Sequence, residues 1–327
     1  MGISSSDFRR AIRAAVGPAF ISYFESLVAR RSWEQTQALG RKMGHWGYRF
    51  HRRYRETAKK NIRLAFGDSL TESRVSEIAD GCLQHLVTLF LEALRMPSMS
   101  REDMAQHVQL KNYEFVTAAL EQDKGAIFFS GHFGNWELGA VRMIYEGAPI
   151  LPLSRAARSP RLAKAITAVR KKLDFPVIPV EEGVKGILRA LKQNYIVPIM
   201  PDRFARGQGM TVPFFDRPTH VWHTPAIMAQ RAGCSIYLCH AIRQPDGLYE
   251  LAVLEPVAVP NSGDRDHDLW LTTARTMAIY ENLVRRNPEQ FTWPYKLWRP
   301  DDTPPSPFPF EELDDDPVIA NARANRP

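Results

Sequence analysis

Short apolar runs alternate with amphipathic, helix-length segments along the chain from about residue 105 onward. The apolar runs predict buried strands at residues 126–130, 150–154, 177–180, 196–200, 235–242 and 249–257. The spacing of apolar residues between these runs predicts helices at residues 161–173, 183–193, 223–232 and 265–287. This alternation indicates an α/β fold over residues 106–300, with a mixed, largely parallel sheet flanked by helices. Ligands of such sheets bind beyond the carboxyl ends of the strands.

The first 105 residues have a different character, because they are mainly helical in pattern and strongly basic. Residues 1–64 contain 14 Lys and Arg against 4 Asp and Glu. Helical spacing from Val75 to Ala93 predicts a long helix that Pro97 ends. The positive charge indicates an anionic partner: a membrane surface, an acidic carrier protein or nucleic acid. A solvated helical face without a partner is the alternative. We expect residues 1–105 to form a membrane-associating region.

The two ends of the chain carry their own predictions. Residues 7–30 combine arginines with an apolar face, which fits a helix on a membrane surface and fits equally a helix docked on the protein's own core. No run of about 18 uncharged apolar residues and no signal-peptide pattern is present. We therefore expect a peripheral protein on the cytoplasmic side of its membrane. Residues 301–327, rich in proline and then acidic, predict a poorly ordered tail.

The cysteines argue against disulfide and metal chemistry. The chain has three of them, Cys82, Cys234 and Cys239, which are too few and too odd in number for a disulfide framework. Cys234, Cys239 and His240 lie close in sequence, but they lack the fourth ligand and the spacing of a zinc site. We expect no metal and no bound organic cofactor.

One segment carries the chemistry, Ile127-Phe-Phe-Ser-Gly-His-Phe-Gly-Asn-Trp-Glu137. A buried strand ends at Ser130, Gly131 and Gly134 allow a tight turn, and a helix begins near Asn135. This places His132 at the mouth of the sheet, and Glu137 at the start of the helix. A histidine can act as the base for a hydroxyl that attacks a thioester, and a carboxylate can hold its imidazole in one tautomer. Taken alone, the pair favours a loop histidine with a structural bond over a catalytic one.

The segment resembles the box of a histidine, four residues and an acid found in glycerolipid acyltransferases. Its full form resembles the late acyltransferases of lipid A biosynthesis and the related mycobacterial mannolipid acyltransferases. Other parts agree: residues 59–66 resemble the N-terminal element of that family, and residues 286–298 resemble its C-terminal signature. Pro201-Asp202, Gly209 and residues 212–215 resemble its third box. The similarity extends over roughly residues 40–300 and occurs in the same order.

The resemblance implies roles for individual residues. His132 corresponds to the general base and Glu137 to the carboxylate of the box. Asp202 ends a predicted strand at the same edge of the sheet, and an acid at that position can also pair with the histidine. The sequence leaves open which of the two carboxylates orients His132. The resemblance implies no metal.

Substrate contacts are expected from the resemblance and from charge. Arg155 matches a family arginine and is expected to bind an acceptor phosphate or a developing negative charge. Arg158 and Arg203, with Arg206, could complete a cationic rim that suits an acceptor phosphate or an acidic acyl carrier protein; scattered solvated charges are the alternative.

In the turn that carries His132, two further residues are expected to lie against the substrate. These are Gly134 and Asn135, where the glycine allows the backbone to approach a ligand closely.

The chain departs from the family pattern at several positions. Arg203 stands where the third box usually has glutamine, and Tyr295 stands where the C-terminal signature often has a histidine. Arg158-Ser159-Pro160 replaces a common Asn-Pro, and the usual N-terminal membrane span is absent. These departures concern the acceptor and the mode of membrane attachment more than the reaction.

The sequence therefore predicts an O-acyltransferase. The donor is expected to be acyl carrier protein or acyl-coenzyme A, and the acceptor a hydroxyl of a membrane glycolipid, with a lipid A precursor as first candidate. A phosphatidylinositol mannoside, another glycolipid or a lysophospholipid is the alternative acceptor. An acyl thioesterase and a noncatalytic membrane-surface binder are the alternatives of another class. No nucleic-acid-binding motif is recognisable, so we expect no nucleic-acid partner.

Overall fold

The computed structural model describes residues 23–154 and 176–327. Its centre is a five-stranded sheet of order β1-β9-β8-β2-β5. The strands are β1 (Val108–Lys111), β2 (Ala126–Phe129), β5 (Ile196–Ile199), β8 (Ile236–Arg243) and β9 (Tyr249–Val257). All neighbours in the sheet pair in parallel except β8 and β9, which are antiparallel. The prediction of a mixed, largely parallel α/β fold is thus confirmed.

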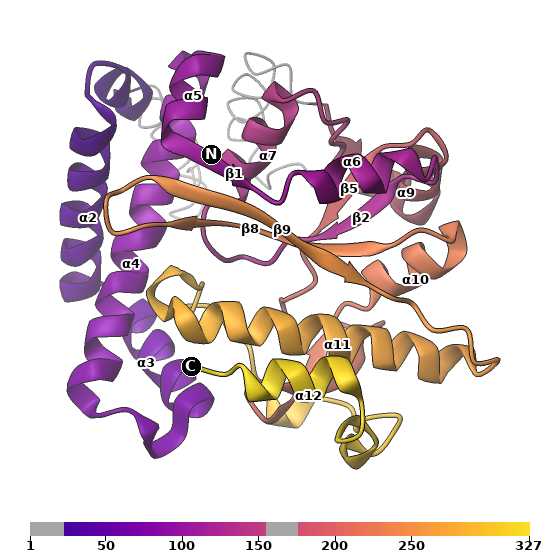
Figure 1. Cartoon of the computed structure of the whole chain (residues 1–327). Helices are drawn as coiled ribbons and strands as arrows, with labels where there is room; N and C mark the ends of the chain where they lie inside the picture. Colours follow the sequence, from indigo (N-terminus) through magenta and orange to yellow (C-terminus); the bar gives the residue numbers. More distant parts are fainter. Residues whose placement is uncertain (1–22, 155–175) are drawn as a thin grey trace, which may run out of the picture.

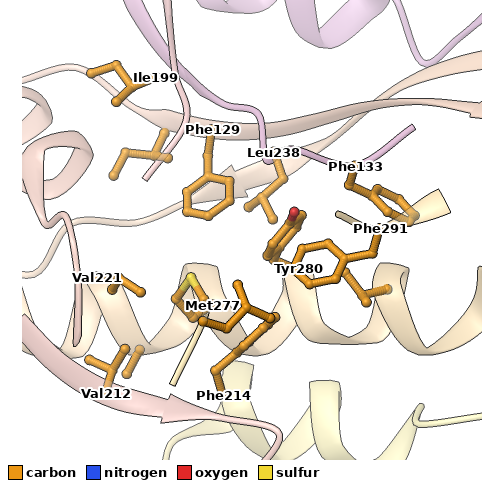
Figure 2. Packing of buried hydrophobic residues seen from close by; sticks show 14 of the residues in the cluster. Phe129, Phe133, Ile199, Val212, Phe214, Val221, Leu238, Met277, Tyr280 and Phe291 are labelled. Carbon is orange, nitrogen blue, oxygen red and sulfur yellow. The ribbon is translucent and has the colours of Figure 1, made fainter. Parts of the chain in front are cut away.

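Helices cover both faces of this sheet (Figure 1). One face packs on α10 (Thr224–Ala232) and α11 (Arg265–Arg286), and the other on α6 (Glu114–Glu121) and α7 (Trp136–Tyr145). Strand β2 is buried along its whole length, and its side chains alternate between the two layers. Phe129 packs with Leu238 and Tyr280 on the α11 side (Figure 2), whereas Phe128 packs with Tyr237 on the other.

Residues 33–107 are helical, as the sequence predicts. The helices are α2 (Trp33–Phe50), α3 (Arg52–Phe66), α4 (Glu72–Arg95) and α5 (Arg101–His107), with short 3₁₀ turns at η1 (Gly67–Ser69) and η2 (Met96–Ser98). Helices α2 and α4 approach so closely that a Cβ on Gly44 would overlap the backbone of α4. Side chains of α3 and α4 join the core on the α11 side of the sheet. Helix α2 also binds the β8–β9 turn, since Trp33 Nε1 and Gln37 Nε2 donate to the Gly247 carbonyl at 3.2 and 2.8 Å.

Part of the predicted helix at residues 7–30 is described. Residues 23–29 are helical, and Phe24 and Val28 are buried against Leu91 and Leu94 of α4. This part packs on the protein's own core. Residues 1–22 and the predicted helix at 161–173 lie outside the described residues. Among the helices that the structure describes, none combines the length and apolarity needed to cross a membrane.

The remaining elements lie around the sheet. They are β3 (Leu153–Ser154), β4 (Ile178–Pro179), η3 (Val180–Glu182) and α9 (Gly183–Lys192), and the hairpin β6 (Met210–Phe214) and β7 (Arg217–Val221). The sequence does not predict this hairpin, because Pro213 and Pro218 lower the strand signal. Its turn residues, Phe215 and Asp216, both have φ of 53°, which is the conformation of a two-residue hairpin turn.

The prediction of a poorly ordered tail at residues 301–327 was wrong. After η4 (Pro288–Gln290), the chain forms η5 (Pro300–Asp302), η6 (Phe310–Leu313) and α12 (Pro317–Ala324), and α12 lies along α11 (Figure 1). Leu313 and Ile319 are buried in the core, and Asp316 pairs with Arg275 of α11 at 2.7 Å. A few buried or paired side chains hold the tail on the core. A prediction from its proline-rich and acidic composition does not detect them.

Candidate active site

His132 and Asp202 meet at the carboxyl edge of the sheet. His132 follows β2 and Asp202 follows β5, and these strands are parallel neighbours, so their carboxyl ends adjoin. The imidazole Nδ1 of His132 lies 2.7 Å from Asp202 Oδ1. The backbone N–H of His132 donates to Asp202 Oδ2 at 2.6 Å. Of the two carboxylates that the sequence leaves open, Asp202 is the one in contact with His132.

Tyr280 of α11 completes this group. Its hydroxyl donates to Asp202 Oδ2 at 2.9 Å, and its ring lies among Phe129, Phe133 and Phe214, near Phe291 (Figure 2). Burial raises the pKa of Tyr280 well above its usual value, so the hydroxyl stays a donor. Sequence reasoning missed this residue, because a tyrosine at helical spacing in an apolar face looks like plain core.

The Asp202 carboxylate is ionised although its side chain is only 1% exposed. Burial alone would raise its pKa. The opposing effects of the His132 charge and of hydrogen bonds from His132 and Tyr280 outweigh burial, and the pKa of Asp202 is lowered. An ionised carboxylate only accepts hydrogen bonds, so when His132 is neutral its Nδ1 carries the proton and its Nε2 has the free lone pair. The His132 side chain is 14% exposed and can reach a substrate as a base.

The turn around His132 requires its glycines. A Cβ on Gly131 would overlap the Tyr280 hydroxyl. Gly134 has φ of 59°, and a Cβ there would overlap the Ala241 carbonyl. Its own N–H donates to the Gln290 carbonyl at 3.0 Å.

Asn135 is completely buried. Its Oδ1 accepts from the backbone N–H of Leu138 at 3.0 Å and so caps α7, while its Nδ2 donates to Glu92 Oε2 at 2.9 Å. Both ends of the amide are used inside the protein. The geometry thus gives Gly134 and Asn135 a role in positioning the turn, and their contact with substrate stays a prediction.

A buried carboxylate holds Asn135 from the helical region. Glu92 of α4 is fully buried, and its Oε1 accepts from Gln37 Nε2 at 2.9 Å. Its Oε2 accepts from Asn135 Nδ2, from the Tyr249 hydroxyl at 2.7 Å and from Arg243 Nη2 at 3.2 Å. One carboxylate therefore joins α2, α4, β8 and β9 to the turn that carries His132. No sequence signal pointed to Glu92, which lies at apolar spacing within a predicted helix.

The other predicted residues are less tightly grouped. Glu137 lies in the first turn of α7, and its carboxylate is not among the described groups that bond to His132. Arg155 and Arg158 lie outside the described residues. Arg203 is exposed, and its guanidinium carbon lies 4.1 Å from the centroid of the Tyr295 ring.

Segments far apart in the sequence converge behind the site. Asn61 of α3 donates from Nδ2 to the carbonyls of Trp293 and Tyr295, at 2.7 and 2.5 Å. Phe133, next to His132, forms a backbone bridge with Phe291. The segment at 286–298 thus contacts both residues 59–66 and residues 127–137. They support the site from the side of α11.

Neither metal ligands nor reactive thiols are evident in the part of the chain that the structure describes. No group of three or more His, Cys, Asp or Glu side chains there is arranged to hold a metal ion. Burial raises the pKa of Cys82 and Cys239 to about 12 and that of Cys234 to about 11. Such thiols stay protonated at neutral pH and do not act as nucleophiles.

Residues 27–300 match the family described as "Bacterial lipid A biosynthesis acyltransferase". The "Phosphatidylinositol mannoside acyltransferase" of Mycolicibacterium smegmatis is 24% identical over 160 residues, 48% of this chain and 53% of that protein. "Lipid A biosynthesis acyltransferase 2" of Shigella flexneri is 24% identical over 165 residues, 50% of this chain and 51% of that protein. The chain thus spans about half the length of these relatives. "Lipid A biosynthesis palmitoleoyltransferase" of Escherichia coli is 22% identical over 264 residues, 80% of this chain and 84% of that protein.

Proposed function

Because the chain belongs to the bacterial lipid A biosynthesis acyltransferase family, we propose that it transfers a fatty acyl group from a thioester to a hydroxyl of a membrane glycolipid, with His132 as general base. The observation that carries the proposal is the contact between His132 Nδ1 and the buried Asp202 carboxylate. It leaves Nε2 as a proton acceptor at the edge of the sheet where ligands bind.

The reaction follows from this geometry. The acceptor hydroxyl donates to Nε2 of His132 and attacks the thioester carbonyl, and His132 takes its proton. Asp202 stays ionised and stabilises the imidazolium that forms. When the tetrahedral intermediate collapses, the carbon–sulfur bond breaks and the imidazolium returns the proton to the departing sulfur. No acyl-enzyme is required, because the acceptor attacks directly.

The resemblance supports further roles for residues that show no contact with His132 or Asp202 in the described part of the chain. Glu137 is proposed as a second catalytic carboxylate because it occupies the acid position of the box. Arg155 and Arg158 are proposed to bind the anionic part of the substrate or the oxyanion.

The relatives support two classes of acceptor. We propose a lipid A precursor, since relatives that align over most of the chain are named lipid A biosynthesis enzymes. A phosphatidylinositol mannoside is the second candidate, since relatives named for that lipid also match. The donor is proposed to be acyl carrier protein or acyl-coenzyme A, because either one presents the thioester that the reaction needs.

We propose that the protein works on the cytoplasmic face of the inner membrane. The corner between α2 and α3 supports contact with an anionic membrane surface. Trp46, Phe50 and Tyr54 are 56%, 74% and 51% exposed there. Residues 41–60 hold eight Lys and Arg against a single acid, Glu56. Exposed aromatic rings among basic residues are typical of a surface that inserts at lipid headgroups.

Vesicle binding tests this corner. We expect wild type to sediment with phosphatidylglycerol vesicles, and a variant with Trp46, Phe50 and Tyr54 all replaced by serine to stay in the supernatant. Replacing Trp222, an exposed tryptophan elsewhere, by serine is the matched control. Equal binding of the triple variant and wild type would rule out this corner as the membrane contact.

The reaction is tested by following label from radiolabelled acyl carrier protein and acyl-coenzyme A into total membrane lipid. Wild type is expected to form a new acylated glycolipid, and His132→Ala is expected to lose about 10²- to 10⁴-fold of that rate. The mass of the product identifies the acceptor. Release of free fatty acid alone would instead indicate a thioesterase, and a His132→Ala variant of unchanged rate would rule out the proposed base.

A further inference from the structure

The guanidinium of Arg203 lies over an exposed aromatic ring at the edge of the site. Its central carbon is 4.1 Å from the centroid of Tyr295, and the tyrosine is 45% exposed. We propose that Tyr295 is a positioning residue that holds Arg203 ready to bind a phosphate group of the acceptor lipid. This inference rests on the proposed function and names the substrate chemistry of the same site.

Arg203 begins beside the catalytic group. It directly follows Asp202, whose carboxylate is buried and bonded to the imidazole of His132. Consecutive Cα atoms are about 3.8 Å apart, so the Arg203 side chain leaves the backbone next to the group that orients the base. An anion bound by Arg203 would therefore lie at the mouth of the site.

Tyr295 is carried by a fixed backbone. Asn61, which is buried in α3, donates to the Tyr295 carbonyl at 2.5 Å and to the Trp293 carbonyl at 2.7 Å. The Tyr295 N–H bonds back to the Thr292 carbonyl at 3.3 Å. The ring therefore projects from a supported turn, although it is itself exposed.

Stacking uses only the face of a guanidinium. The N–H groups point outward in its plane and stay free to bind an anion in a bidentate manner. Phosphate oxygens match this fork in charge and geometry. An arginine held on a ring is therefore better prepared to bind phosphate than a freely rotating one.

Arg203 differs from the other stacked arginines that the structure describes. Arg243, Arg285 and Arg299 also lie over aromatic rings, and so does Arg55. Each of these four has a carboxylate partner, which is Glu92, Glu281, Asp302 or Glu56 respectively. In residues 23–154 and 176–327 no carboxylate forms an ion pair with Arg203, so its guanidinium is open to an anion from outside this part of the protein.

The pair also joins two of the positions at which the sequence departs from its family. Arg203 replaces the usual glutamine of the third box, and Tyr295 replaces the frequent histidine of the C-terminal signature. The two positions are 92 residues apart in sequence, and the structure brings them into contact.

A double-mutant cycle on the intact protein tests the inference. Acyl transfer is measured while the glycolipid acceptor is varied at saturating donor, and then while the donor is varied at saturating acceptor. We expect Tyr295→Leu to raise the acceptor KM by about tenfold, with kcat within about twofold of wild type. Tyr295→Phe keeps the ring and should behave as wild type. Arg203→Ala should raise the acceptor KM at least as much, and adding Tyr295→Leu to it should change nothing further.

Inorganic phosphate is the second probe. It should inhibit wild type competitively with the acceptor, and it should inhibit Arg203→Ala and Tyr295→Leu several-fold less. Arg231→Gln, which removes an exposed arginine on α10, is the charge control and should match wild type in both assays.

Three results would overturn the inference. They are equal KM values for Tyr295→Leu and Tyr295→Phe, an effect on the donor KM alone, and additive losses in the double variant. Thermal denaturation of each variant separates these results from misfolding, and no large loss is expected because the ring is half exposed. If wild type itself transfers no acyl group, the proposed function has failed. If wild type is active and the cycle shows no coupling, only the role of Tyr295 has failed.

Discussion

Two polar networks hold opposite ends of the turn at residues 131–135, and they differ in what they leave open. At one end Asp202 binds His132 and Tyr280, and the imidazole keeps a free nitrogen. At the other end Glu92 accepts a hydrogen bond from Asn135, and both oxygens of that carboxylate already have donors inside the protein.

The difference separates reactivity from positioning. Both carboxylates are buried, and both accept several hydrogen bonds. The Asp202 network ends at a side chain that can reach a substrate, so changes there should alter rate more than stability. The Glu92 network is closed, so changes there should alter stability first and rate only through the turn.

The largest effect is expected from Asp202→Asn. An amide no longer fixes the tautomer of His132 or stabilises an imidazolium, so kcat should fall by about 10³- to 10⁴-fold. The loss of folding stability should be small compared with the loss of transition-state stabilisation. Steady-state acyl transfer and thermal denaturation of the same preparation check both. A comparable fall for Glu137→Gln, with Asp202→Asn near wild type, would assign the orienting role to the other carboxylate.

The next effect concerns the closed network. Glu92→Ala leaves Arg243 buried without its partner, and should lower the free energy of unfolding by about 3–5 kcal/mol. Denaturant unfolding measures this. Glu92→Gln keeps the shape and some of the hydrogen bonds, so it is the milder control. If Glu92→Ala lost activity but not stability, the Glu92 network would not act on stability first, and the contrast with the Asp202 network would be wrong.

Low pH should destabilise the folded protein through His85, which bonds the turn at residues 131–135. Burial, with the nearby charge of Arg243, lowers the pKa of His85 from 6.5 to about 3, and its Nε2 bonds the Gly134 carbonyl. The folded protein keeps this histidine neutral, while the unfolded chain takes up a proton below about pH 6.5. Stability is therefore full above that pH and falls by about 1.4 kcal/mol per unit as pH drops toward the folded value.

His85→Gln is the variant that checks this effect, since glutamine retains an N–H donor but does not titrate. Its melting temperature should decline less steeply than that of wild type between pH 6.5 and 4. Parallel curves would mean that His85 does not set the acid limit.

The smallest effect should come from Tyr280→Phe. Asp202 loses one of its donors but keeps both bonds from His132. We expect a decrease in kcat of about tenfold or less, equivalent to about 1.4 kcal/mol, with little change in the KM of either substrate. A loss as large as that of Asp202→Asn would mean that the hydroxyl takes part in the reaction itself.

The sequence predicts well what depends on strand ends. The apolar runs at 126–130 and 196–200 predict two buried strands of a largely parallel sheet, so His132 and Asp202 are expected at the same edge from the sequence alone. The sequence cannot decide whether Asp202 or Glu137 orients His132, because that depends on the orientation of α7 relative to the loop after β5.

Residues that act from within helices leave no mark in the pattern. Tyr280 and Glu92 lie on helix faces with apolar spacing. Tyr280 is 78 residues from its partner Asp202, and Glu92 is 43 residues from its partner Asn135. The tail was misjudged for a related reason, because Leu313 and Ile319 are isolated apolar residues among prolines and acids. Composition averages over a segment, whereas packing depends on single side chains.

The bonds from α2 to the β8–β9 turn have a consequence for how the chain is made. Trp33 and Gln37 find their acceptor on Gly247, which lies 214 and 210 residues later in the sequence. A ribosome has therefore synthesised most of the polypeptide before α2 can complete its contacts. Contacts of such long sequence separation slow folding, because the loop must close before they contribute. During translation, the bonds of α2 to the β8–β9 turn can form only after Gly247 has been made.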